Sequence, residues 1–222
     1  MHRPAALAPG VPAQPGAGAG ELAWVEGVSL LGMCVTAVAI IDAAEHDRRL
    51  ASQCGAVTDP ALLNCLLGLP LGASVPDLVA WAETADQPPG VIGRDTDGIT
   101  VTRRLTAALA IEDVLVAAPV GRELRAVQDV SLFARFARRW VVTTKHRMPE
   151  PILLEAKLCG VGILGPSGAL LAGETPVTRE MDAWDWMLRE KVYRRWLSQS
   201  ARGYATVSPA RATGEATATQ AS

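Results

Sequence analysis

Residues 152–164 read ILLEAKLCGVGIL, an apolar run interrupted by a glutamate and a lysine that stand two positions apart. Branched apolar residues predict a β-strand here, and Gly160 and Gly162 permit a bend within it. In a strand, side chains two positions apart point to the same side, so we expect Glu155 and Lys157 to share one face. Opposite charges inside an apolar strand indicate either a buried polar site or a solvated surface ion pair.

An apolar triplet followed by Glu-x-Lys resembles the core strand of the PD-(D/E)xK nuclease superfamily. The resemblance covers about residues 112–172 and implies a nuclease-like core that cleaves DNA with Mg²⁺. It also implies that Asp129 and Glu155 hold the metal and that Lys157 positions or activates the attacking water. Paired carboxylates are the hard oxygen ligands that Mg²⁺ takes, and a nearby cation offsets charge at the scissile phosphate. The catalytic residues implied by the resemblance are therefore Asp129, Glu155 and Lys157.

Basic residues are frequent between residues 103 and 147, just before this stretch. If several of them share a face, they provide the cationic surface that a DNA-docking protein needs for phosphate groups. Only 3 of the 21 basic residues are lysines, a ratio typical of a high-GC genome, so an arginine-rich solvated surface is the alternative. The expected DNA-binding residues are Arg103, Arg104, Arg138, Arg139, Lys145 and Arg147.

The remaining motifs exclude several classes of function. The four cysteines all stand more than three residues apart, so the chain has no Cys-x-x-Cys zinc or redox motif, and its three histidines are scattered. The sequence contains neither the Gly-x-x-x-x-Gly-Lys loop of P-loop NTPases nor the Gly-x-Ser-x-Gly turn of α/β-hydrolases. We therefore expect structural thiols in a protein of the reducing cytoplasm.

The N-terminal half is predicted to be mainly helical. A serine or an aspartate stands at an N-cap position before each of three apolar stretches. A strand, an Asp-Gly turn and a second strand follow over residues 91–104, which indicates a β-hairpin. Two short helices and a hairpin in this order resemble a winged-helix arrangement. The three helices are expected over residues 29–50, 61–67 and 74–82.

Residues 27–41 form a run of 15 residues without a charge. The run is too short for a membrane-spanning helix, which needs 18 or more apolar residues. We therefore expect a helix that is apolar on all sides and buried at the centre of the N-terminal half, with Leu31 and Val38 inside it. Because this half is a thin shell for such a helix, homodimerisation through it is favoured over membrane insertion.

The last element has the clearest pattern. Apolar residues recur at steps of three and four over residues 178–200, which predicts a long amphipathic helix capped by Thr178. Acidic and basic residues four positions apart on this helix are expected to form ion pairs. These pairs are Asp185–Arg189 and Glu190–Arg194.

The fold class expected from these patterns is α+β. A helical, winged-helix-like N-terminal half packs on a small mixed sheet, which the long amphipathic C-terminal helix closes. The expected regions are a disordered tail over 1–20, the winged-helix-like region over 21–104, the nuclease-like region over 105–202 and a second disordered tail over 203–222.

Composition limits the function. The chain has 222 residues, of which 49% are hydrophobic, so it is not wholly disordered. The leading hypothesis is a cytoplasmic DNA-associated protein, either a Mg²⁺-dependent endonuclease or a degenerate derivative of one. Residues 1–100 carry 4 basic and 11 acidic side chains, and residues 101–222 carry 17 and 12. This opposite charge supports the alternative, a non-enzymatic regulatory or adaptor module that binds a protein partner or a second copy through its N-terminal half. No membrane partner is expected.

Overall fold

The computed structural model of the chain describes residues 21–72, 74–76, 88–94, 100–177 and 180–206. Its helices are α1 (Ala43–Ala51), α2 (Pro60–Leu67), α3 (Glu123–Ser131), α4 (Glu150–Leu158) and α5 (Ala183–Thr206). Its strands are β1 (Glu21–Leu30), β2 (Met33–Ile41), β3 (Ser74–Pro76), β4 (Ile92–Arg94), β5 (Thr100–Arg103), β6 (Leu109–Ala117), β7 (Arg138–Val142), β8 (Gly162–Gly165) and β9 (Gly168–Leu171). The α+β class expected from the sequence is therefore confirmed.

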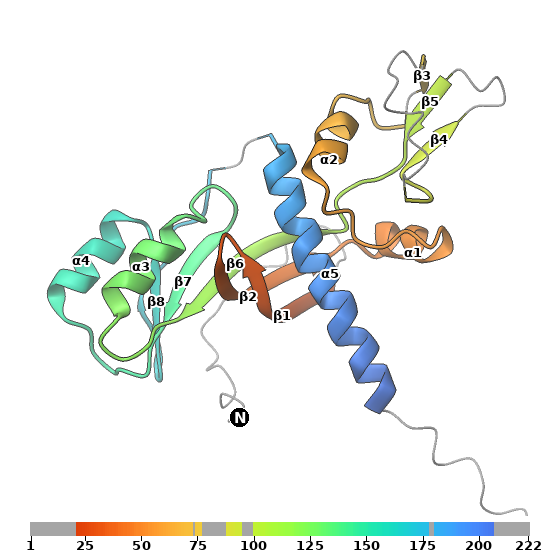
Figure 1. Ribbon diagram of the computed structural model, residues 1–222. Coiled ribbons are helices and arrows are strands. Elements are labelled where there is room, and N and C mark those ends of the chain that lie inside the picture. Colours follow the sequence, from red (N-terminus) through yellow and green to blue (C-terminus); the bar gives the residue numbers. More distant parts are fainter. Residues whose placement is uncertain (1–20, 73, 77–87, 95–99, 178–179, 207–222) are drawn as a thin grey trace, which may run out of the picture.

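A six-stranded mixed sheet forms the centre of the molecule, in the order β1-β2-β6-β7-β8-β9 (Figure 1). β1, β2 and β6 are antiparallel neighbours, whereas β6, β7 and β8 run parallel and are connected through α3 and α4. A smaller sheet, β3-β5-β4, lies beside α1 and α2. Because β2 pairs with β6, the boundary expected between residues 104 and 105 does not separate two sheets.

The N-terminal half begins with a β-hairpin, so the helix expected over residues 29–50 is wrong for residues 29–41. β1 and β2 pair from Glu21↔Ile41 to Leu30↔Met33. The turn between them has positive φ angles at Leu31 (50°) and Gly32 (80°), which a helix does not allow. A run that is apolar throughout has no period, so it cannot distinguish a buried strand from a buried helix. Helical residues begin only at α1.

The other expectations for this half are partly met. α2 follows Asp59, whose carboxylate accepts a hydrogen bond from the Ala61 N–H (2.9 Å), as the cap pattern predicted. The two strands of the hairpin are β4 and β5, which are antiparallel, while their Asp-Gly turn lies outside the described residues. The helix expected to begin at Ser74 is wrong at residues 74–76, which form β3, and the rest of it lies outside the described residues.

Residues 150–158 form the helix α4, so the strand expected through Glu155 and Lys157 is wrong. Pro151 stands in the first turn, where its missing N–H costs nothing, and leucine, glutamate, alanine and lysine are strong helix formers. The Cys159 N–H donates to the Glu155 carbonyl (2.9 Å), which continues the helical pattern. The strand comes later, as β8, and it is followed by a tight turn and the short strand β9.

The C-terminal helix α5 begins at Ala183, after a reciprocal cap. The Asp185 N–H donates to the Asp182 carboxylate (2.9 Å), and the Asp182 N–H donates to the Asp185 carboxylate (3.3 Å). The cap expected at Thr178 lies outside the described residues. α5 packs on β1, β6 and α2, and no described helix is both long and apolar enough to cross a membrane.

A buried ion-pair network attaches α5 to α1. Arg49 and Glu190 are fully buried, and the guanidinium of Arg49 donates to both carboxylate oxygens of Glu190 (2.6 and 2.7 Å). The Arg49 Nε also donates to Glu45 (2.7 Å), four residues earlier on α1. Buried charges are stable only when they are paired in this way, so the network fixes how α5 is rotated about its axis.

Candidate nucleic-acid interface

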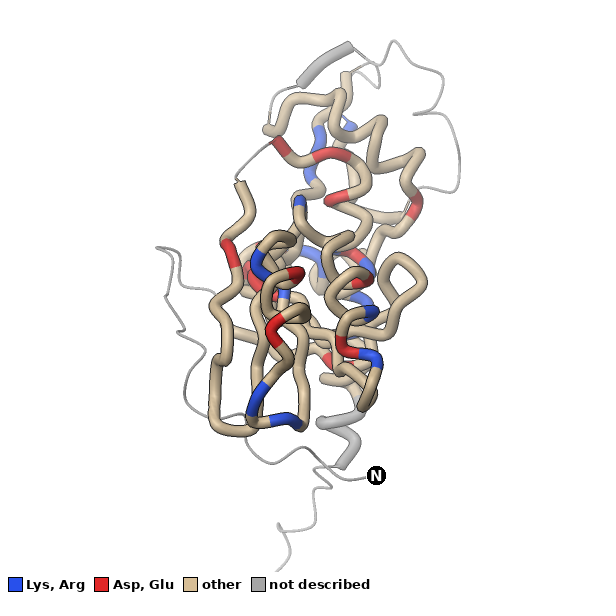
Figure 2. The backbone as a smooth tube through the Cα atoms, turned by 90° about the vertical axis from the view of Figure 1, so that its left-hand side faces the viewer, with Lys and Arg blue, Asp and Glu red and all other residues tan. Residues whose placement is uncertain are grey.

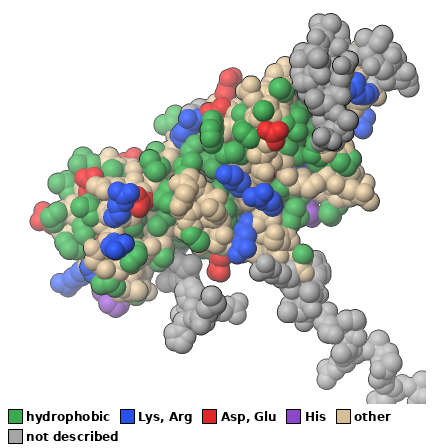
Figure 3. Space-filling view, in the orientation of Figure 1, with side chains coloured by type: hydrophobic (Ala, Val, Ile, Leu, Met, Phe, Trp, Pro, Cys, Tyr) green, Lys and Arg blue, Asp and Glu red, His purple; other side chains and the backbone are tan. Residues whose placement is uncertain are grey.

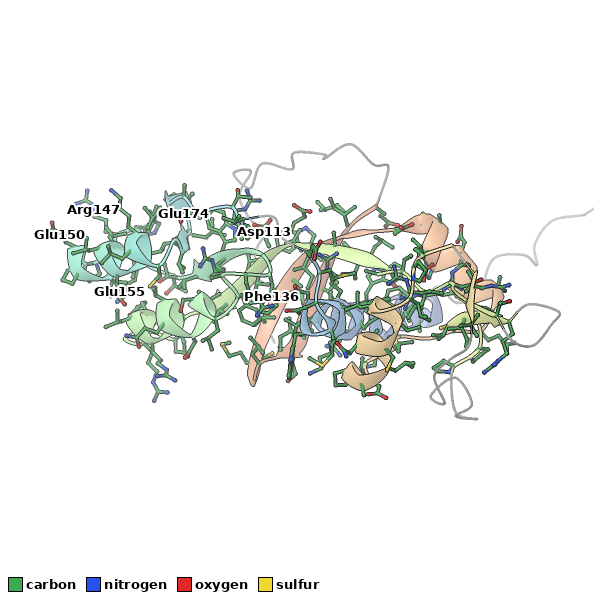
Figure 4. The ribbon with its side chains drawn as sticks, turned by 90° about the horizontal axis from the view of Figure 1, so that it is seen from above. Asp113, Phe136, Arg147, Glu150, Glu155 and Glu174 are labelled. Atoms are coloured by element: carbon green, nitrogen blue, oxygen red, sulfur yellow. The ribbon has the colours of Figure 1, made fainter. Side chains whose placement is uncertain are left out.

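The residues of the expected nuclease site are not brought together. In a helix, positions two apart point about 200° away from each other, so Glu155 and Lys157 on α4 do not share a face. Figure 4 shows Glu155 near the end of the molecule, on the same helix as Glu150. Asp129 lies on α3 and pairs with Arg125 (2.9 Å). Within the described ranges, no three His, Cys, Asp or Glu side chains are grouped as a metal site.

Gly160, Gly162 and Gly165 have the Gly-x-Gly-x-x-Gly spacing of a dinucleotide-binding loop. That function needs the glycines between a strand and the start of a helix, where the helix N-terminus faces the pyrophosphate. Here they precede and form β8, which turns directly into β9. Gly162 is required for another reason, since a Cβ there would lie 2.3 Å from the Trp140 ring. The motif is therefore structural.

The six expected DNA-binding residues do not form one surface. Figure 2 shows basic positions at both ends of the molecule. Four of the six are held by contacts within the protein. Arg103 donates to the Leu66 carbonyl (3.0 Å), Arg138 pairs with Asp113 (2.5 Å), Arg139 donates to the Cys159 carbonyl (2.9 Å), and Lys145 pairs with Glu123 (2.7 Å). Only Arg104 and Arg147 are exposed.

A different set of cations lies together on α5. Lys191, Arg194 and Arg195 are spaced so that they lie on one side of the helix, and we call them the α5 basic cluster. Figure 3 shows lysine and arginine side chains gathered over the middle of the molecule, where α5 crosses the sheet. Lys191 and Arg194 form no hydrogen bond or ion pair through their side chains with any residue that the structure describes.

The buried network explains why Arg194 has no partner. The sequence predicts an ion pair between Glu190 and Arg194, one helical turn apart, and this prediction is wrong. The Glu190 carboxylate is turned into the core, where it accepts from Arg49 and also from the Val57 N–H (2.9 Å) and the Trp186 indole N–H (3.1 Å). All of its strong acceptor positions are used inside the protein, so Arg194 faces solvent with its charge uncompensated.

A bulge in β1 forms the other wall of the site. The pairing of β1 with β2 shifts register between Val25 and Val28, and Gly27 has a φ of +64°. The Glu26 carbonyl accepts from Arg195 Nε (2.8 Å) and from Gln199 Nε2 (2.9 Å). Because a Cβ at Gly27 would lie 3.0 Å from the Arg195 guanidinium, only glycine lets this side chain lie so close to the strand.

Between α5 and this bulge lies a cavity of about 270 Å³. The described residues that line it include no carboxylate: they are Gly27, Val28, Ser29, Lys191, Arg194, Arg195 and Ser198. Three cations and two hydroxyl groups therefore face the same open space. Such a set can donate several charge-assisted hydrogen bonds to an oxyanion, and a phosphate group has the oxygen atoms to accept them.

The sequence analysis missed this site because it placed Arg194 in an ion pair along the helix and gave Lys191 and Arg195 no role in binding. The spacing of residues 191, 194 and 195 does indicate that they share one face of the helix. The sequence does not indicate that Glu190 pairs with Arg49 in the core instead of with Arg194. No family model, curated protein or solved structure matches the chain.

Proposed function

We propose that the protein binds DNA through the phosphate backbone and that the α5 basic cluster is the contact surface. The observation that carries this proposal is the cavity beside α5, which is lined by three cations and by no described carboxylate. Phosphate contacts supply most of the affinity of DNA-binding proteins and do not depend on base sequence.

The side chains that line the cavity would contact phosphate in different ways. Arg195 is held by the Glu26 carbonyl and gives a fixed point of contact. Lys191 and Arg194 are not held by any side chain in the described part of the chain, so they can turn toward neighbouring phosphate groups along a strand. Ser29 adds a neutral donor that suits the remaining phosphate oxygens, whereas the Ser198 hydroxyl already donates to the Arg194 carbonyl (2.9 Å).

The nuclease part of the sequence hypothesis does not enter the proposal. It depended on Glu155 and Lys157 sharing one face of a strand, and both lie on α4. Asp129, which the resemblance assigned to the metal, is paired with Arg125. We therefore propose DNA binding without assigning a Mg²⁺ ion or a cleavage step to these residues.

Fluorescence anisotropy with a labelled DNA duplex of mixed sequence tests the proposal. We compare the wild type with the double variant Lys191→Gln/Arg194→Gln, because neither of the two native side chains pairs with a residue that the structure describes. The control is Arg104→Gln/Arg147→Gln, which removes the same charge from the two exposed arginines of the surface predicted from sequence. We expect the α5 variant to bind about tenfold more weakly, because two charge-assisted contacts are lost, and the control to bind nearly as the wild type does. Equal losses in both variants, or no binding by the wild type, would overturn it.

A further inference from the structure

A second cavity, of about 250 Å³, lies on the other side of α5 near its first turns. Three parts of the chain form it: residues 111–112 of β6, the turn between α3 and β7, and the segment before α5. Its charged lining residues among those described are Glu112, Arg135, Arg138, Asp185 and Arg189. Phe136, which Figure 4 labels near the middle of the molecule, contributes to an apolar wall.

Two of the three arginines in this cavity already form ion pairs within the protein. Arg138 makes two hydrogen bonds to Asp113, whose carboxylate also accepts the Trp140 indole N–H (2.7 Å). Arg135 pairs with Asp182 and lies 3.9 Å from Asp185. Neither guanidinium has its full charge available to a ligand.

Arg189, the third arginine, differs from these two in its contacts. The sequence predicts an ion pair with Asp185, but Asp185 is engaged in the cap of α5 and with Arg135, and this prediction is wrong. Arg189 makes no hydrogen bond or ion pair with the residues placed by the structure, and it is half-buried. Burial lowers its pKa, while the charges of Asp185 and Glu112 act against that shift. The guanidinium lines this cavity, so it can donate hydrogen bonds to an anionic group placed there.

Glu112 provides the opposite charge. β2 pairs with β6 through Val38↔Asp113 and then Ala39↔Ile111, so Glu112 is the extra residue of a bulge. Its side chain is exposed and lines the same cavity as Arg189, but the two are not in ion-pair contact. A cation and an anion that pair with no described residue therefore face one cavity without touching each other.

We propose that this cavity binds a small zwitterion, an α-amino acid with an apolar side chain. The carboxylate of the ligand pairs with the fork of Arg189, and its ammonium group pairs with Glu112. The apolar side chain lies against Phe136, Ile111 and Met181. A phosphate dianion is disfavoured because it would face Glu112 and Asp185, and a simple amine is disfavoured because it would face the arginines.

Calorimetric titration of the full chain with L-phenylalanine tests this inference. N-acetyl-L-phenylalanine removes the ammonium charge and phenethylamine removes the carboxylate. We expect saturable binding of phenylalanine at millimolar concentration and about tenfold weaker binding of either analogue, since each loses one charge-assisted contact.

Three variants complete the test. Arg189→Gln and Glu112→Gln should each weaken phenylalanine binding, and Glu112→Gln should bind the N-acetyl analogue as well as it binds phenylalanine. Arg194→Gln, in the other cavity, should bind phenylalanine as the wild type does. Absence of saturable binding by the wild type, or equal affinity of the wild type for phenylalanine and its N-acetyl analogue, would overturn the inference. Phenylalanine binding unchanged in both cavity variants would overturn it as well.

Discussion

The carboxylate of Glu190 accepts four hydrogen bonds, two from Arg49 and one each from Val57 and Trp186. Removing both ions of such a pair from water is costly, and the pair persists because every donor and acceptor is satisfied. The same contacts determine which side chains of α5 remain free. With Glu190 directed inward and Asp185 used in the helix cap, Arg194 and Arg189 are each left without the partner that helical spacing offers.

Glu45 makes this network sensitive to acid. Burial by itself raises the pKa of Glu45, but hydrogen bonds and charges from Arg48 and Arg49 outweigh it, so the pKa lies below its ordinary value of 4.5. The folded state therefore favours the ionised carboxylate more than the unfolded chain does. This contribution to stability is present above about pH 4.5 and is lost as the pH falls through the lowered pKa.

Urea unfolding at several pH values between 7 and 3 checks this prediction. We expect the wild type to be clearly more stable than Glu45→Gln near neutral pH, and the difference in unfolding free energy to shrink below about pH 4.5. A difference that stays constant over the whole range would contradict it.

At the scale of elements, the β1–β2 turn contains a residue that is unfavourable for its backbone conformation. Leu31 and Gly32 both have positive φ angles, which is the geometry of a two-residue type I′ turn. Leucine is a poor residue there, because its Cβ is crowded in the left-handed region, and Leu31 is exposed, so no packing is gained.

Leu31→Asn should therefore stabilise the protein, because asparagine followed by glycine is the preferred pair for this turn. We expect an increase of about 0.5–1 kcal/mol, which for a chain of this size raises the melting temperature by about 1–4 °C. Differential scanning calorimetry measures it. The control is Leu30→Asn, which places an amide in the core next to the turn and should destabilise. A lower melting temperature for Leu31→Asn would mean that the turn is not of this type.

Sequence patterns predicted the elements that carry local signals. The Asp59 cap predicted α2, and the apolar recurrence predicted α5. The hairpin residues predicted β4 and β5, and the end of the apolar run over residues 152–164 predicted β8. The errors fall where a local signal is missing. Residues 27–41 carry apolar side chains on both faces of β1 and β2, including the exposed face of β1, and α4 buries only Ala156 fully. Neither segment therefore shows the period of its own structure.

The candidate site was less predictable than the fold. Lys191, Arg194 and Arg195 can be placed on one helix face from their spacing. Whether they are free depends on Glu190 meeting Arg49, which stands 141 residues away in the chain, and no local pattern contains that information. For the same reason Arg138, Arg139 and Lys145 were expected at a DNA surface although tertiary contacts hold them.

At the scale of the whole molecule, the opposite charges of the two sequence halves do not form two separate bodies. β1 and β2 from the acidic half lie in the same sheet as β6 to β9 from the basic half (Figure 1). The two halves of opposite charge therefore share one sheet, and head-to-tail association of two copies stays a prediction. The charge that the proposed DNA contact uses is local, in the α5 basic cluster.

The salt dependence of DNA affinity tests the α5 interface most directly. Each phosphate neutralised by a lysine or arginine contributes about 0.9 to the slope of log affinity against log salt concentration. We therefore predict that Lys191→Gln/Arg194→Gln lowers the magnitude of this slope by about 2, whereas Arg104→Gln/Arg147→Gln leaves it unchanged. Identical slopes for the wild type and the α5 variant would contradict the assignment of DNA binding to the α5 basic cluster.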